Sequence, residues 1–182
     1  MRLFQINPQR AFTLIEVLIA FIILSMALLG AMALQVKAKQ ASFDSIQRTA
    51  AVALGNDIIE RIRVNDHPQI VSLYKQTITS EGTLKPSSTC FSNSCNAEQI
   101  VLLDIQQWQR AIQARENTGL LDNATLCINP ILIGNVFNVE IIISWQGRQA
   151  FNATNKANEI SCGDTGEKRR LVVFSSYIYP RG

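Results

Sequence analysis

Hydrophobic and polar positions divide this chain into segments of different character. Between Phe12 and Val36 nearly every residue is apolar, and Glu16 is the one charge. About 25 residues at a helical rise of 1.5 Å span roughly 37 Å, which is enough to cross a bilayer. A carboxylate in such a segment is costly in lipid unless it is paired. We therefore expect Glu16 to have a partner that the membrane alone does not supply.

The helical pattern continues beyond the apolar run. No proline occurs from Phe12 to Asp66, and after Val36 apolar residues recur every three or four positions between charged ones. The stripe consists of Phe43, Ile46, Ala50, Leu54, Ile58 and Ile62. This pattern predicts one long helix, apolar all round in its first half and buried on one face in its second half. Pro68 ends it, since residues before proline avoid the helical region.

Weaker patterns follow the long helix. Residues 76–98 are polar and without periodicity, which predicts a loop. Residues 97–116 predict a shorter helix with Leu102, Ile105, Trp108 and Ile112 on one face. Trp108 is expected to be buried, and Asp104, one turn earlier, to be exposed or to cap the helix.

Three segments near the end of the chain predict strands, at 125–128, 136–145 and 170–179. In the second, Phe137, Val139, Ile141, Ile143 and Trp145 alternate with smaller or polar residues. Gln146-Gly147-Arg148 is expected to turn the chain into a short fourth strand at 149–152. An antiparallel sheet that packs its apolar face on the second half of the long helix buries both stripes, so the fold class is α+β.

Charge and cysteine content limit the possible partners and the compartment. The cluster Lys168-Arg169-Arg170 precedes an apolar strand and is expected to form a solvated turn rather than a DNA contact. All four cysteines follow the apolar run, and an even number suits an oxidising periplasm. Of three possible pairings we favour Cys90–Cys95 and Cys127–Cys162. With one histidine, His67, a zinc site is not expected.

The first residues carry a more specific signal. The opening Arg10-Ala11-Phe12-Thr13-Leu14-Ile15-Glu16 resembles the class III signal of type IV pilins and of type II secretion pseudopilins. The resemblance implies that residues 1–11 are a leader, that prepilin peptidase cuts between Ala11 and Phe12, and that the new amino group of Phe12 is methylated. Glu16 becomes the fifth residue of the mature chain. The family usually has glycine where this chain has Ala11, and we expect cleavage at this small residue too.

The remainder of the chain is similar to minor pilins of the PilV type. The shared features are its length, the four cysteines, Asp104 with Trp108, the segment Leu24 to Gly30 and the ending Tyr177-Ile178-Tyr179-Pro180. The resemblance implies a leader at 1–11, a transmembrane or fibre-core half-helix at 12–36 and a periplasmic domain at 37–182. It implies inner-membrane residence with a single span, followed by incorporation at low level into a surface pilus.

The partners that this resemblance implies are other minor pilins, the major pilin, prepilin peptidase, the inner-membrane assembly machinery and, before assembly, the lipid bilayer. Without residues 1–11 the chain has 15 basic against 14 acidic residues. This near-neutral balance does not favour nucleic acid. No cofactor, metal or enzymatic activity is expected, because the chain has no phosphate loop, serine elbow or paired catalytic carboxylates.

Several alternatives remain open on sequence grounds. Ala31-Met32-Ala33 matches the cleavage site of an ordinary secretory signal, but an acid in the apolar region and the unbroken helical pattern disfavour it. A plain membrane anchor is a second alternative. A minor pseudopilin of a type II secretion system shares the same opening, and a tip pilin that binds DNA or a surface is a further possibility. A membrane-anchored periplasmic enzyme is least favoured.

Overall fold

The computed structural model of the chain describes residues 12–86, 90, 94–118, 120–150 and 155–180. The expected leader, with Ala11, lies outside these residues. The elements follow in the order α1 (Leu14–Val64), α2 (Ile70–Tyr74), β1 (Gln76–Thr79), α3 (Ala97–Asn117), β2 (Asp122–Ile133), β3 (Val136–Gln146), α4 (Asn155–Glu159) and β4 (Arg169–Ile178). Packing divides the chain into two units, one up to Phe43 and one from Asp44 onward. The predicted boundary between residues 36 and 37 stays a prediction.

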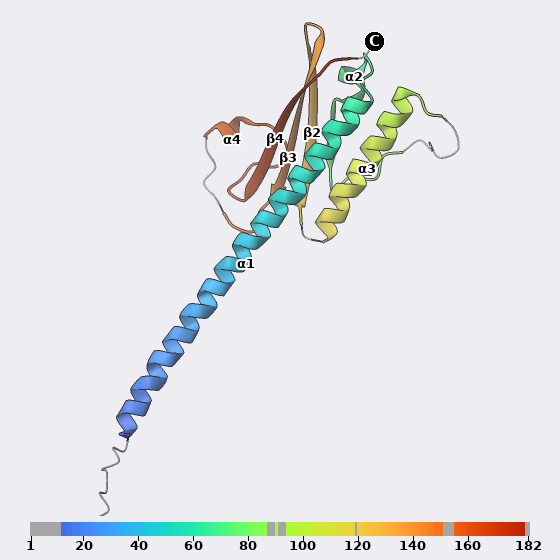
Figure 1. Cartoon of the computed structure of the whole chain (residues 1–182). Helices are drawn as coiled ribbons and strands as arrows, with labels where there is room; N and C mark the ends of the chain where they lie inside the picture. Colours follow the sequence, from blue (N-terminus) through green and yellow to red (C-terminus); the bar gives the residue numbers. More distant parts are fainter. Residues whose placement is uncertain (1–11, 87–89, 91–93, 119, 151–154, 181–182) are drawn as a thin grey trace, which may run out of the picture. The chain divides into compact units, whose positions relative to one another are not determined.

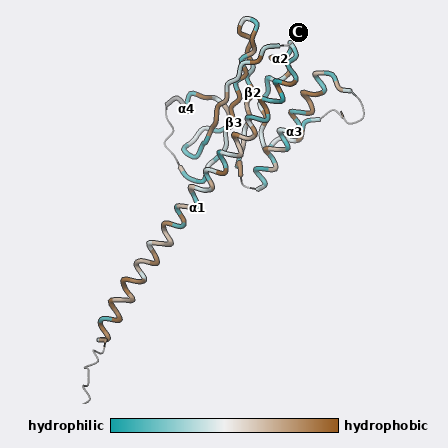
Figure 2. The backbone as a smooth tube through the Cα atoms, in the orientation of Figure 1, coloured by the Kyte–Doolittle hydropathy of each residue, from teal (hydrophilic) through white to brown (hydrophobic). Residues whose placement is uncertain are grey.

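The long helix predicted from the sequence is confirmed as α1, which runs unbroken from Leu14 to Val64 (Figure 1). Every residue from Phe12 to Lys39 is exposed in the isolated chain. Figure 2 shows this first half as largely hydrophobic. Glu16 lies in the first turn of α1. An apolar helix without a buried face needs lipid or other apolar helices around it.

In the second unit, α1 buries one face. Its buried residues are Gln47, Ala51, Leu54, Gly55, Ile58, Ile59 and Ile62. The predicted stripe is confirmed at Leu54, Ile58 and Ile62, but it is wrong at Ile46, which is 51 % exposed. The helix presents Ala51 and Gly55 to the domain instead. Gly55 has no side chain, so Phe174 can approach the helix backbone at this position.

The sheet is a four-stranded antiparallel meander in the order β1-β2-β3-β4. The α+β architecture predicted from the sequence is therefore confirmed (Figure 1). The fourth strand, however, is β1, which lies inside the predicted loop. The described residues of the expected strand, Gln149 and Ala150, are not in a strand. β1 escaped prediction because only one of its residues, Ile78, is buried.

The core lies between the sheet and the helices. The predicted alternation of β3 is confirmed, since Phe137, Val139, Ile141, Ile143 and Trp145 are all buried. The helix α3 is confirmed close to its predicted bounds and begins with a capping box of Asn96 and Gln99. Its buried face contains Val101, Ile105, Trp108 and Ile112, whereas Leu102 is exposed, contrary to prediction. Ile105, Trp108 and Ile112 join α1 and β3 in one cluster.

Candidate functional site

The first candidate site is the start of α1. Phe12 is 79 % exposed, and the helix begins two residues later. Within the described part of the chain, the Glu16 carboxylate makes no hydrogen bond or ion pair, although its backbone N–H donates to the Thr13 carbonyl at 3.1 Å. A carboxylate in the first turn of a helix is favoured by the helix dipole. Its position among exposed apolar side chains leaves it available to a cationic group from outside the described residues.

One helix in the described residues is long and apolar enough to cross a membrane, and it is α1. The apolar positions from Leu14 to Val36 point in all directions around the helix axis. This surface suits either a bilayer or a bundle of similar helices, because both provide apolar contacts without water. Length and composition make it a candidate membrane and assembly surface.

A second candidate site is a buried polar network that links α1, α2 and α3. Asp104 on α3 is 4 % exposed, so the expectation of an exposed or capping acid is wrong. Its carboxylate accepts hydrogen bonds from the Arg61 guanidinium at 3.1 Å and from the Tyr74 hydroxyl at 2.9 Å. A buried carboxylate persists only with such partners.

The network extends on both sides of Asp104. Arg61 also pairs with Asp57 at 3.0 Å and donates to Gln107 at 2.6 Å. Burial raises the pKa of Asp104 above its usual value of 3.8, even though Tyr74 and Arg61 oppose this shift. Burial also raises the pKa of Tyr74. Burial therefore disfavours the ionised carboxylate of Asp104 more than its two donors favour it.

The Trp108 indole belongs to the same arrangement. It is buried, as predicted, and donates to Asp57 on α1 at 3.2 Å. Asn65, just beyond the end of α1, donates to the Tyr74 hydroxyl and to the Ala97 carbonyl. These contacts attach α2 and the start of α3 to the end of the long helix through polar bonds as well as apolar packing.

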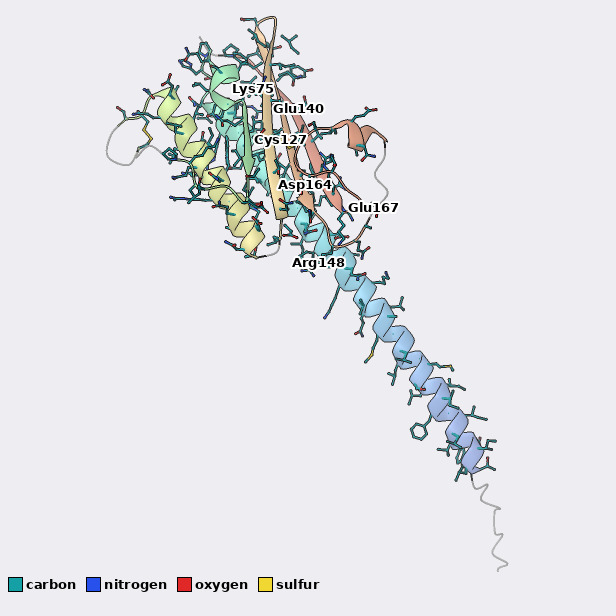
Figure 3. The ribbon with its side chains drawn as sticks, turned by 180° about the vertical axis from the view of Figure 1, so that it is seen from behind. Lys75, Cys127, Glu140, Arg148, Asp164 and Glu167 are labelled. Carbon is teal, nitrogen blue, oxygen red and sulfur yellow. A yellow bond between two sulfur atoms is a disulfide. The ribbon has the colours of Figure 1, made fainter. Side chains whose placement is uncertain are left out.

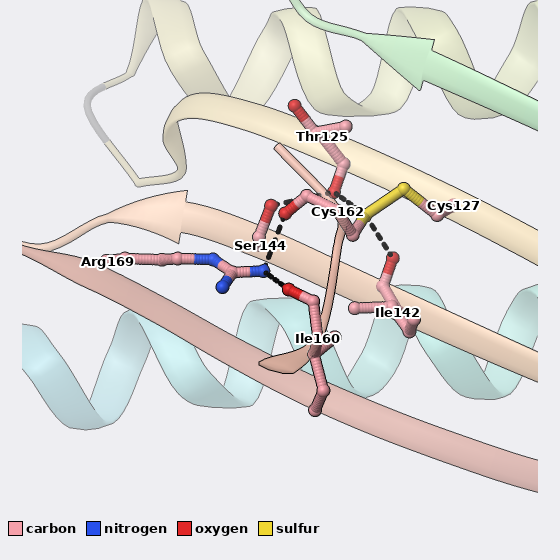
Figure 4. Close-up of a disulfide and its surroundings, with 7 residues drawn as sticks. All are labelled: Thr125, Cys127, Ile142, Ser144, Ile160, Cys162 and Arg169. Atoms are coloured by element: carbon pink, nitrogen blue, oxygen red, sulfur yellow. Dashed lines mark hydrogen bonds between the residues drawn. A yellow bond between two sulfur atoms is a disulfide. The ribbon is translucent and has the colours of Figure 1, made fainter. Parts of the chain in front are cut away.

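A third candidate site is the segment 157–164, called the strap here, which crosses the sheet face opposite α1. A disulfide joins Cys127 on β2 to Cys162 in the strap (Figure 4). The two cysteines form a small apolar cluster with Ile142 and Ile160, separate from the main core. Figure 3 shows this face of the sheet, with Cys127 and Asp164 labelled.

Arg169, the first residue of β4, fastens the strap from the other side. Its guanidinium donates to the carbonyls of Ile160 and Cys162, both at 2.8 Å (Figure 4). It also donates to the Ala157 carbonyl at 3.1 Å. Burial lowers the pKa of Arg169. The prediction that Lys168-Arg169-Arg170 forms a solvated turn is thus wrong for Arg169 and Arg170, which are half-buried, while Lys168 is exposed.

Two backbone features support the same fastening. Gly163 has φ +72°, and a Cβ there would meet the Ser144 hydroxyl and Thr125, so the strap approaches the sheet too closely for a side chain. Asn123, at φ 45°, donates to Asp164 at 2.6 Å. The strap is held by a covalent bond, by Arg169 and by these contacts.

The second disulfide joins Cys90 to Cys95 between β1 and α3. Both disulfides are the pairs favoured from the sequence. His67 lies just after α1, where its Nδ1 accepts from the Gln69 backbone. In the part of the chain that the structure describes, no three potential metal-ligating side chains gather in one place.

Comparison with known families adds to this geometry. Residues 6–32 match the prokaryotic N-terminal methylation motif, and residues 33–106 match the Tt1218-like family, described as type IV pilin Tt1218. These two matches support the type IV pilin family. No curated protein and no solved structure gave a significant match to the chain.

A pilin domain that follows an N-methylation motif implies a role related to pili. It suggests processing by prepilin peptidase and assembly with other pilins. The apolar helix fits a membrane-anchored pilin that is later incorporated into pili. Pilins are in general structural and non-catalytic proteins.

Sequence patterns missed several residues that the structure brings together. Arg61 and Asp57 are spaced one helical turn apart, which signals a local pair but not the buried Asp104 beyond it. Tyr74 lies in a five-residue helix that has no periodicity of its own. Arg169 lies in a cluster of three basic residues, and the sequence does not distinguish it from the other two. Its three hydrogen bonds to backbone carbonyl groups appear only in the structure.

Proposed function

We propose that this chain is a minor pilin of the PilV type that takes part in type IV pilus assembly and enters the fibre at low level. One observation supports this most directly. A methylation motif at residues 6–32 includes the start of an exposed apolar helix, and that helix continues into a disulfide-bonded α+β domain. The fully exposed first half of α1 suits a waiting state in lipid and a final state among other pilin helices.

Processing at the N-terminus prepares the chain for this role. Prepilin peptidase cuts between Ala11 and Phe12, and the amino group of Phe12 is then methylated. The exposed position of Phe12 just before the helix supports such access. Glu16 then lies one helical turn from a free amine, so its carboxylate pairs with the amine of Phe12 in its own chain or in a neighbour.

The orientation proposed is a single span with the domain in the periplasm. Its support is the pair of disulfides, Cys90–Cys95 and Cys127–Cys162, both of which lie after the apolar run. Such bonds form in an oxidising compartment. The partners are then the major pilin, other minor pilins and the assembly machinery of the inner membrane.

Intact mass and N-terminal sequencing of the mature chain test the processing route. The expected chain begins at methylated Phe12 in both membranes and sheared fibres. A chain that begins at Leu34 would indicate a secretory signal, and a retained Met1 would indicate a plain anchor. Either result contradicts the proposal.

A clean deletion tests the assembly role. The expected strain has fewer surface pili, with weaker twitching or DNA uptake, while the pool of major pilin is unchanged. Normal piliation in that strain contradicts the role.

The methylation motif equally suits a minor pseudopilin of type II secretion, and neighbouring genes for a secretin-linked secretion set would favour that second candidate.

A further inference from the structure

The sheet face opposite α1, called the outer face here, changes character along its length. At one end, Cys127 is aligned with Ile142, and Ile142 with Val173. The strap covers this end, since Cys162 and Ile160 pack on Cys127 and Ile142. The chain therefore covers its own apolar surface here and holds the cover in place with a disulfide.

The middle of the outer face is polar. Asn129 is aligned with Glu140, and Glu140 with Ser175. Ser175 and Glu140 are exposed, and Glu140 is labelled on this face in Figure 3. Water solvates this row, so it needs no protein cover.

The end of the outer face at the β2–β3 hairpin is apolar again. Ile131 is aligned with Asn138 and Asn138 with Tyr177, while Ile133 is aligned with Val136. Tyr179 lies two residues after Tyr177, just beyond the end of β4. The exposed members are Ile131 at 51 %, Ile133 at 52 %, Tyr177 at 63 % and Tyr179 at 70 %, and they are called the hairpin patch here.

The hairpin patch has the size of the apolar patches that often have a function. From these exposures, its four side chains present on the order of 500–600 Å² of mainly apolar area, the upper end for the largest patch on a typical monomer. No charged residue occurs from Pro130 to Phe137. Two identical patches can therefore approach each other without electrostatic repulsion.

The area points to the kind of contact. Two copies packed patch to patch would bury about 1,000–1,200 Å² in total, the low end for specific protein interfaces. Such a dimer is weak in solution, but confinement of both chains to one membrane by α1 raises their effective concentration. The same patch on both partners suits a two-fold contact, which closes after two subunits.

We propose that the hairpin patch is a contact between two copies of this chain that are held in the same membrane. The proposal rests on the membrane anchoring in the proposed function and goes beyond the contacts made by α1. It assigns the uncovered end of the outer face to a second copy, just as the strap covers the other end.

Cross-linking of the full chain in inner membranes tests this contact. A single thiol is introduced as Tyr179→Cys and treated with a short bismaleimide. The matched control is Leu102→Cys, at an exposed apolar residue of α3 away from the hairpin patch. The expected result is a product of twice the chain mass from Tyr179→Cys, with about tenfold less from Leu102→Cys.

A second arm identifies the surface. Ile131→Asn with Ile133→Asn, in the Tyr179→Cys background, should lower the dimer yield about tenfold, because two buried aliphatic side chains are lost. Correct folding of each variant is checked in two ways. The intact mass of the chain shows whether its two disulfides have formed, and thermal unfolding shows whether its domain is folded.

Three results would overturn the proposal. They are equal yields from the two thiols, a yield that the asparagine substitutions leave unchanged, and a product whose mass shows a different pilin or a lipid as the partner. The outcome is separable from the pilus role. Methylated Phe12 without a dimer refutes only this contact, whereas a dimer formed by a chain that retains Met1 refutes only the pilus role.

Discussion

The aromatic ring of Phe174 on β4 occupies the space that a side chain at Gly55 of α1 would need. A Cβ at residue 55 would lie 2.6 Å from Cζ of Phe174, closer than side chains pack. Glycine thus lets the long helix and the sheet approach each other at this point.

Gly55→Ala should therefore destabilise the domain, although alanine favours a helix by about 1 kcal/mol over glycine. Overpacking typically costs about 1–3 kcal/mol, so we expect a net loss in the free energy of unfolding. Chemical denaturation measures the change in unfolding free energy that Gly55→Ala causes in the natural chain, and the change that it causes in a Phe174→Ala background. The loss should vanish in that background, where the ring is absent. An equal loss in both would show that the ring is not its cause.

Asp104→Asn tests the buried network through its pH dependence. The folded pKa of Asp104 is raised above 3.8, so the folded chain binds the proton more readily than the unfolded chain. The contribution of Asp104 to stability therefore falls as pH rises from about 3.8 through its raised pKa. The stability of Asp104→Asn relative to the natural chain should rise over the same range.

Unfolding free energies measured from pH 4 to pH 8 check this trend. Asp44→Asn is the control, at an acid outside the network that Arg61 and Tyr74 make with Asp104. A stability difference between Asp104→Asn and the natural chain that is constant with pH would contradict the burial argument.

Arg61→Met, by contrast, leaves Asp104 without its cation and should lower stability by about 1–3 kcal/mol.

The two disulfides should differ in their contribution to stability. Cys127–Cys162 closes a loop with a sequence separation of 35, against 5 for Cys90–Cys95. Chain entropy predicts about 4 kcal/mol for the longer loop and about 2 kcal/mol for the shorter one. Urea unfolding of the two double-alanine variants checks the order, and a larger loss from Cys90 and Cys95 would contradict it.

Arg169→Lys should loosen the strap, because an ammonium group cannot reach three carbonyl groups in the fixed geometry of a guanidinium. We expect faster reduction of Cys127–Cys162 by a mild reductant, measured by alkylation and mass spectrometry. The control is Arg48→Lys, which changes an exposed arginine on α1. Equal reduction rates in both variants would show that Arg169 does not protect the disulfide.

Glu16→Ala should leave the chain in the membrane but weaken its entry into fibres, because the pairing with an N-terminal amine is lost. We expect the ratio of fibre-bound to membrane-bound chain to fall about tenfold, equivalent to ~1.4 kcal/mol. Glu60→Ala, at an exposed acid of the domain, should leave this ratio unchanged. Normal incorporation of Glu16→Ala would remove this role.

Local periodicity explains which elements could be predicted from sequence. The helix α1 and the alternation of β3 each repeat a signal over many residues, so their existence and type follow from short-range order. β1 has four residues and one buried side chain, which is too little for a period to emerge. Its pairing with β2 depends on residues about fifty positions away.

Among the candidate sites, the methylation motif and the lone charge at Glu16 are determined by sequence alone, because they are contiguous. The tertiary structure decided the rest. Asp104 is buried because Arg61 and Tyr74 converge on it from two other helices. Arg169 holds the strap because the chain turns back between Cys162 and β4 and brings three carbonyl groups to its guanidinium. The exposure of the hairpin patch depends on which faces of the sheet the helices and the strap cover, and the period of apolar residues along one strand does not determine that.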